Sequence, residues 1–165
     1  MWVRTQDDEL VNFDHVEFVR IEQDEDERDF EVRAYPFQWI ESEDDVFLVR
    51  RKARTLAEQR GFDPFSMAAL TTATSELGRN AFLHAGGGAV ILEELQDGDL
   101  VGIRLQFRDH GPGIADVERV MQGGYSTLKS LGLGLSGSRR LVNEFHIETA
   151  VGQGTLITII KWKRL

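Results

Sequence analysis

Two residues of the segment SELGRNAFLHA, positions 75–85, have the types and spacing of a magnesium-nucleotide site. Glu76 and Asn80 are four residues apart, so a helix through this segment would carry both side chains on one face. Magnesium prefers oxygen ligands and keeps several waters, so one amide oxygen and the phosphates of a nucleotide can hold it. An ordinary polar helix face would contain the same pair, and both interpretations stay open at this point.

An aspartate followed by two glycines is the second feature. The sequence DHGPGI brings Asp109, Gly111 and Gly113 directly after an alternating segment, which predicts that they stand at the end of a strand. Glycines let the backbone approach a ligand closely, and a carboxylate accepts a hydrogen bond from an amino group such as that of adenine. A tight turn has the same composition, because Asp, Pro and Gly are its usual residues.

Glycine-rich backbone recurs twice near the C-terminus. The sequence GLGLSGSRR, which contains Gly132, Leu133 and Gly134, leads into a predicted helix whose free amides would favour phosphate. Glycines two apart arise by chance about once in a chain of this length, at a usage of about 7%. The sequence is neither a Walker loop nor a dinucleotide fingerprint. Gly154 and Thr155 belong to GQGT, which a hairpin turn alone would explain.

Hydrophobic periodicity predicts the elements that must position these residues. Residues 1–35 predict short strands, and Ser42 is the expected N-cap of a helix that ends near Gly61. The later predictions are a helix over 64–84, strands over 89–95 and 100–107, a helix over 135–144, and strands over 145–151 and 155–163. This order predicts an α/β (α+β) two-layer sandwich with helices on one face of a mixed, mostly antiparallel sheet. Trp162, with Leu156 and Ile160, is expected in its core.

Composition narrows the class of protein. The 165 residues include no cysteine, which excludes disulfides and thiolate metal sites. No apolar run approaches the roughly 20 residues of a membrane span and the N-terminus lacks a signal peptide, so we expect no membrane association and a cytoplasmic location. The net charge is −9, with −12 in residues 1–45 and +3 in the remainder. Such an acidic chain repels a phosphate backbone, so nucleic acid is not an expected partner.

In this order, the four features resemble the boxes of the GHKL ATPase superfamily, which has the Bergerat ATP-binding fold. The resemblance spans about residues 30–165, with Glu76 and Asn80 at the positions of the N-box. We therefore predict an acidic β-rich extension over residues 1–28 and a GHKL-type kinase domain over residues 29–165. Within the superfamily, the chain is similar to the small switch-protein serine kinases of bacterial stress signalling, the RsbT-like and anti-sigma-kinase group. The phrases that carry this similarity are TTATSELGRNAFLHAGGG, DHGPGIADVERVMQGGYST, GLGLSGSRRLVNEF and VGQGTLITIIKW.

The resemblance implies a role for each box. Glu76 would be the general base toward a partner's hydroxyl, and Asn80 would give an oxygen to Mg²⁺ in the Mg-ATP complex. Asp109 would pair with the adenine amino group, with Thr155 nearby. The remaining implied ATP-binding residues are Gly111 and Gly113 of the first glycine box, Gly132, Leu133 and Gly134 at the phosphates, and Ser126 and Thr127 in a lid over residues 115–131.

Two functions follow from the resemblance. The first is an ATP-dependent protein serine/threonine kinase of a partner-switching stress pathway, with a STAS-domain protein as its substrate. The second is an anti-sigma factor or other partner-switch module, in which ATP is mainly structural. A phosphatase or a sigma factor is a further implied partner. The sequence leaves the oligomeric state open, as it does the roles of residues 1–28 and of Lys129 in the lid.

Overall fold

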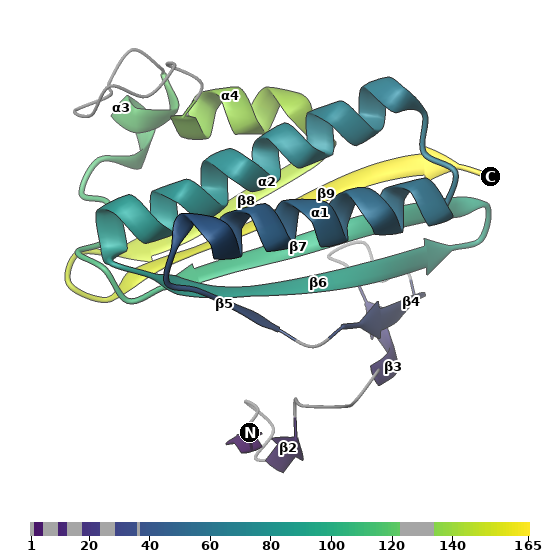
Figure 1. Ribbon diagram of the computed structural model, residues 1–165, viewed down its shortest axis with the longest axis horizontal. Coiled ribbons are helices and arrows are strands. Elements are labelled where there is room, and N and C mark those ends of the chain that lie inside the picture. Colours follow the sequence, from purple (N-terminus) through teal and green to yellow (C-terminus); the bar gives the residue numbers. More distant parts are fainter. Residues whose placement is uncertain (1, 5–9, 13–17, 24–28, 36, 123–133) are drawn as a thin grey trace.

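The computed structural model of the chain describes residues 2–4, 10–12, 18–23, 29–35, 37–122 and 134–165. Helices α1 (Glu43–Gln59), α2 (Pro64–Ala85) and α4 (Gly134–Leu141) cover one face of a sheet, and the short α3 (Val117–Met121) lies beside α4 (Figure 1). The predicted two-layer sandwich is therefore confirmed.

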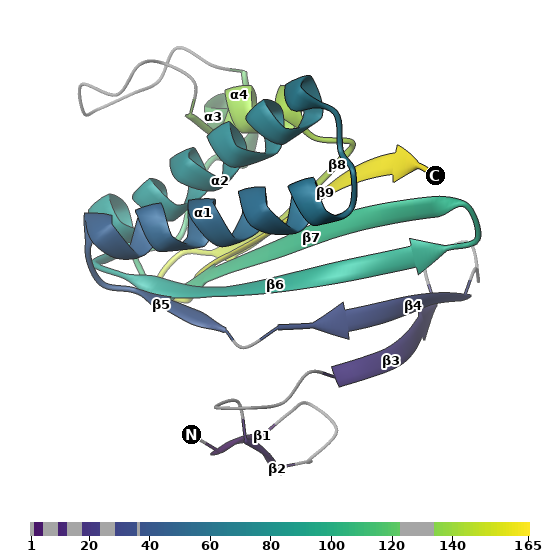
Figure 2. The ribbon, with the colours of Figure 1, turned by 45° about the vertical axis from the view of Figure 1, so that its right-hand side comes forward.

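The main sheet contains seven strands in the part of the chain that the structure describes. They are β3 (Phe18–Gln23), β4 (Asp29–Ala34), β5 (Gln38–Ile40), β6 (Gly88–Asp97), β7 (Leu100–Asp109), β8 (Glu144–Ala150) and β9 (Gly154–Arg164). Their order is β3-β4-β6-β7-β9-β8, with β5 also paired to β6. Each described pair is antiparallel, where the sequence predicted a mixed, mostly antiparallel sheet. The long β6 and β7 lie at its centre (Figure 2).

The first two helices begin and end where their capping residues predict. The Ser42 side chain accepts a hydrogen bond from the Asp45 amide at the start of α1, which confirms the predicted N-cap. The Asp63 carboxylate caps α2 in the same way, and Gly86 ends that helix in the left-handed conformation with φ 75°. The stripe of α1 that faces the core is the predicted one, namely Val46, Val49, Ala53, Leu56 and Ala57.

The main core lies between the helices and the sheet. Alternate residues of β7 and β9 point to the helices, so that Ile103, Leu105 and Ile159 are fully buried against Leu70 and Leu77 of α2. Complete burial of each such side chain contributes about 1.5–3 kcal/mol. This packing fixes the position of α2 on the sheet, and with it the position of Glu76.

Two sequence predictions need correction. The residues of β9 that alternate with Ile157 and Ile159 point away from the helices, so Trp162 packs beside Ile160 in a small second cluster on the other face of the sheet. The last helix was predicted to reach Glu144, but α4 ends at Leu141. Glu144 instead pairs with Ile160 as the first residue of β8, because long-range strand pairing prevails over the local helical pattern.

The N-terminal residues contribute strands. β1 (Trp2–Arg4) and β2 (Leu10–Asn12) pair with each other in a separate two-stranded sheet. β3 pairs with β4 and so adds to the main sheet a strand that precedes residue 29, the predicted start of the ATP-binding domain. The division of the chain at residues 28 and 29 stays a prediction.

Candidate functional site

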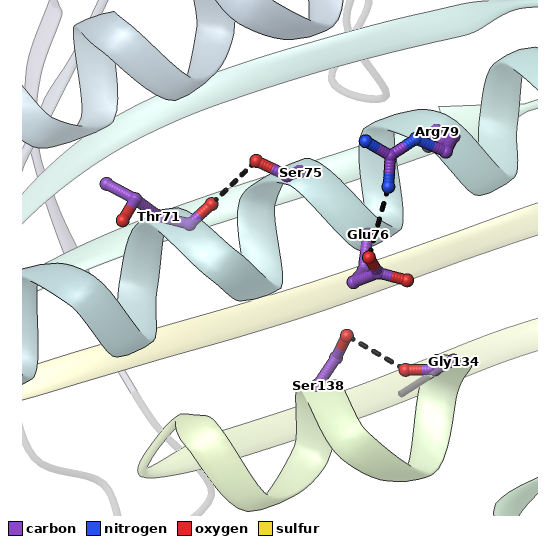
Figure 3. A network of polar contacts seen from close by, with 6 residues as sticks. All are labelled: Thr71, Ser75, Glu76, Arg79, Gly134 and Ser138. Atoms are coloured by element: carbon purple, nitrogen blue, oxygen red, sulfur yellow. Dashed lines mark hydrogen bonds and ion pairs between the residues drawn. The ribbon is translucent and has the colours of Figure 1, made fainter. Parts of the chain in front are cut away.

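Glu76 lies in the second half of α2, at the boundary between α2 and α4. Figure 3 shows its side chain facing α4, where Ser138 and Gly134 lie. The residue is only 8% exposed, and its Oε1 lies 3.1 Å from Nη1 of Arg79, three residues further along the same helix. The ion pair fixes the orientation of the buried carboxylate. The other carboxylate oxygen, Oε2, is thus the one that can act on a ligand.

Asn80 follows Glu76 by one helical turn. It is half-buried, and within the described residues its side-chain amide has no hydrogen-bond partner. Because α2 is an uninterrupted helix from Pro64 to Ala85, Glu76 and Asn80 share one of its faces, as their spacing predicted. An amide oxygen at this position can ligate a hard cation such as Mg²⁺.

Asp109 is the last residue of β7 and is paired across the sheet with Thr155, near the start of β9. The alternation of β7 turns it to the same face as Phe107, which is the face that the helices cover. Its Oδ1 accepts a hydrogen bond from the Gly111 amide at 2.9 Å, which orients the carboxylate. Within the described residues Oδ2 is not engaged, so it can accept a hydrogen bond from a ligand.

Three glycines allow the loops around Asp109 to touch. A Cβ atom at Gly111 would lie 2.5 Å from the Cβ of Ala85 on α2, and one at Gly113 would lie 2.1 Å from the Ala150 carbonyl oxygen. A Cβ atom at Gly154 would lie 2.1 Å from the carbonyl oxygen of Asp109. Only glycine allows these approaches, which bring the end of α2, the end of β7 and the β8–β9 turn together.

A pair of threonines completes this corner. The Thr149 hydroxyl donates to the Gly154 carbonyl at 2.9 Å and accepts from the Ile114 amide at 3.0 Å. It also lies 3.1 Å from the hydroxyl of Thr155. Because the one proton of Thr149 is already used, Thr155 must donate in this contact. The free lone pairs of the Thr155 oxygen can then accept from a ligand or a bound water beside Asp109.

The structure places seven of the predicted site residues. Glu76 and Asn80 lie on α2, Asp109 and Thr155 on neighbouring strands, Gly111 and Gly113 in the loop between β7 and α3, and Gly134 at the start of α4. Gly134 has φ +35°, and no atom of the described residues is found within 4 Å of its Cβ position, so this part of the molecule leaves its backbone open to a ligand. The other four, Ser126, Thr127, Gly132 and Leu133, lie outside the described residues.

Two residues of this arrangement were not found from the sequence. Arg79 could have been found by its spacing of three residues from Glu76, which is typical of an ion pair on a helix. Thr149 gave no such signal, because only the register of β8 against β9 brings it opposite Thr155. Among the described residues, no three His, Cys, Asp or Glu side chains cluster as a metal site. None of the described helices has the length and apolar character of a membrane-spanning helix.

Comparison with known proteins identifies the family of the chain. Residues 67–164, from α2 to β9, match the family described as Histidine kinase-, DNA gyrase B-, and HSP90-like ATPase. The chain belongs to this family. The predicted membership of the GHKL superfamily is thereby confirmed, and the site described above lies within the matched residues.

The similar proteins include a kinase and anti-sigma factors. The chain is 42% identical to the serine/threonine-protein kinase RsbT of Bacillus subtilis over 125 residues, which is 76% of this chain and 94% of RsbT. It is 31% identical to an anti-sigma F factor of Anoxybacillus flavithermus over 99 residues, covering 56% of this chain and 66% of that protein.

A solved structure shares the fold. It contains the RsbU and RsbW domains of a Mycobacterium tuberculosis protein and superposes with a TM-score of 0.52 at 23% identity. The match covers 78% of this chain but only 33% of that one, so the comparison bears on the ATPase fold alone.

Proposed function

We propose that this protein transfers the γ-phosphoryl group of ATP to a serine or threonine hydroxyl on a STAS-domain partner in a partner-switching pathway. The observation that carries the proposal is the position of Glu76 in a member of an ATPase family. Its buried carboxylate lies one helical turn before Asn80 and is held by an ion pair with Arg79. The similarity to a protein named as a serine/threonine kinase, along nearly all of that kinase's length, supports the same reaction.

Adenine recognition is assigned to Asp109 and Thr155. The free Oδ2 of Asp109 would accept from the adenine amino group, and the Thr155 oxygen would accept from the same group or from a bridging water. Guanine has no amino group at that position, so this pair would select ATP over GTP. The glycines beside these residues have no side chain, so the nucleotide could approach the backbone closely there.

The donors fit a magnesium nucleotide. Asn80 would hold Mg²⁺ through its amide oxygen, with nucleotide phosphates and waters as the other ligands, so a cluster of carboxylates is not required. When bound, the metal neutralises charge on the phosphates. The backbone amides around Gly132–Gly134, at the start of α4, would bind phosphate oxygens, and Ser126 and Thr127 would lie in the lid over the nucleotide.

Glu76 acts on the incoming hydroxyl. Its carboxylate takes the proton of the partner's Ser or Thr as the oxygen forms its bond to the γ-phosphorus. The bond between that phosphorus and the β–γ bridging oxygen breaks, and ADP leaves with the bond's electron pair. Arg79 contributes as a positioning residue, because it holds one oxygen of Glu76 and directs the other toward the site.

The Glu76→Gln substitution tests the proposal. The amide has nearly the shape of the carboxylate but cannot take a proton, so we expect transfer to fall about 10²–10⁴-fold. ATP affinity, measured by calorimetry, should change little. The control is Glu58→Gln, which removes an exposed carboxylate of α1 and should leave both quantities unchanged. Loss of ATP binding together with transfer, or full transfer by the variant, would contradict the assigned role; transfer is measured as a mass gain on the partner.

The similarity to anti-sigma F factors favours a second candidate, an ATP-dependent binding module whose partner is a sigma factor or a phosphatase. In that case, ATP and a partner would bind tightly while no phosphate appeared on any partner Ser or Thr. Asn80→Ala should weaken magnesium-dependent ATP binding in both candidates, so it tests the metal ligand independently of catalysis.

A further inference from the structure

A groove lies between α1 and the sheet, on the side of α1 that faces away from α2. Its floor is apolar and comes from Val49 and Leu56 of α1 and from Val90 and Leu92 of β6. The volume is about 320 Å³. No residue of α2, β7 or β9 lines it, so the groove is distinct from the site around Glu76 and Asp109.

One side of the groove is rigid. Tyr35, between β4 and β5, donates its hydroxyl proton to Oε2 of Glu94 at 3.2 Å, and Arg60 pairs with the same oxygen at 2.8 Å. Burial, followed by the nearby Glu94 charge, raises the pKa of Tyr35, so its phenol stays neutral at physiological pH. The Tyr35 ring is therefore held as a fixed apolar part of the wall.

The rim is cationic. Arg51 and Lys52 are exposed residues of α1 that line the groove, together with the exposed Thr55 and Gln59. Within the described residues neither cation pairs with a carboxylate, and Lys52 only donates to the neutral side chain of Gln38 at 3.1 Å. Two cations beside an apolar floor, with no carboxylate partner among the described residues, are notable in a chain of net charge −9. Their field would attract an acidic group to this place.

We propose that this groove is a docking site for an acidic segment of a partner protein, which inserts an apolar side chain between α1 and β6 while its carboxylates pair with Arg51 and Lys52. The combination of a desolvated apolar anchor with charges at the rim is typical of protein recognition. The cations lie at the exposed rim rather than on the floor, where they can meet a chain that crosses the groove. The proposal does not depend on phosphoryl transfer, because the groove lies on the opposite side of α2 from Glu76.

A titration of the full chain with a short acetylated peptide, Glu-Asp-Leu-Phe-Asp-Glu, tests the proposal. Amide resonances of the isotope-labelled protein are followed by NMR, and we expect shifts at Val49, Lys52, Leu56, Val90 and Leu92. The same peptide with Lys in place of each acidic residue is the control and should produce no shifts. Absence of shifts with the acidic peptide, or shifts confined to the Glu76 and Asp109 region, would overturn the proposal.

Matched variants then distinguish the effect of the groove residues on peptide binding from the effect of the protein's net charge. Reversal of both rim charges, Arg51→Glu with Lys52→Glu, should weaken the peptide at least about tenfold, which corresponds to 1.4 kcal/mol. Arg54→Glu makes the same kind of change on α1 outside the groove and should have a much smaller effect. Thr55→Trp should block the groove without a change of charge and also abolish binding. Equal losses from Arg54→Glu and the rim reversal would refute the site.

Two other probes identify the occupant. Octanoate, an anion with an apolar tail, and a single-stranded oligonucleotide are titrated under the same conditions. We expect both to perturb the groove resonances less than the acidic peptide does. If octanoate binds as tightly as the peptide, the groove is a small-molecule pocket; if the oligonucleotide does, it is a nucleic-acid surface. Either result would overturn the assignment to a protein partner.

Discussion

Gly113 is the residue at which we can test most sharply how the end of α2, the end of β7 and the β8–β9 turn are held together around Asp109. Its φ is +70°, and a Cβ atom there would lie 2.1 Å from the Ala150 carbonyl oxygen in the β8–β9 hairpin. Real Cβ atoms stay at least 3.0 Å from such an atom, so Gly113→Ala must move the loop or the hairpin by about 0.9 Å. The obstacle is backbone, so a change of side-chain rotamer cannot relieve it.

Two contributions set how far Gly113→Ala lowers the free energy of unfolding. The left-handed backbone costs a non-glycine residue about 1–2 kcal/mol. The forced movement also strains two hydrogen bonds that join the loop to the hairpin, from the Gly152 amide to the Pro112 carbonyl at 2.8 Å and from the Ile114 amide to Thr149 at 3.0 Å. Each contributes about 0.5–1.5 kcal/mol. Gly113→Ala should therefore lower the free energy of unfolding by about 2–5 kcal/mol.

Gly152 provides the control. It lies in the same hairpin with φ +77°, but no atom of the described part of the chain lies within 4 Å of its Cβ position. Gly152→Ala should therefore show the backbone cost alone, about 1–2 kcal/mol. Urea unfolding measures both variants, and calorimetry measures their ATP affinity, which should fall further for Gly113→Ala because Asp109 and Thr155 move with the loop. If the two variants are equally stable and bind ATP equally, the close approach does not hold the corner together.

Three further perturbations have defined outcomes. Ser42→Ala removes the N-cap of α1 and should lower the free energy of unfolding in urea by about 1 kcal/mol. Hydrogen bonds from the Ser42 hydroxyl and then from the Glu41 amide lower the pKa of Asp45. The stability that the Asp45 carboxylate contributes is therefore complete above its unfolded pKa of about 3.9 and is lost as pH falls through the lower folded pKa. Asp45→Asn should reduce this loss of stability when urea unfolding is measured at acid pH. Thr155→Val should weaken ATP binding in calorimetry about 2–10-fold, whereas Thr158→Val, on the other face of β9, should not.

Local patterns in the sequence predicted most elements because they depend on local physics. Ser42 and the apolar stripe of α1 define a helix through capping and periodicity alone, and Val101 to Phe107 define a strand by alternation. Predictions failed where distant pairing decided the outcome. Glu144 continues a helical pattern but joins β8 because it pairs with Ile160. Trp162 lies outside the main core because pairing with β7 and β8 fixes which residues of β9 face the helices.

For the candidate site, the sequence by itself determined the residue types and their order along the chain. It placed Glu76 and Asn80 on one helical face, because the helical period is a property of the backbone. Only the tertiary structure decided that Gly111 packs on Ala85, that Thr149 meets Thr155, and that two exposed cations border an apolar groove on α1. These contacts join segments far apart in the chain, and their geometry follows from how the helices and strands pack together rather than from any local preference.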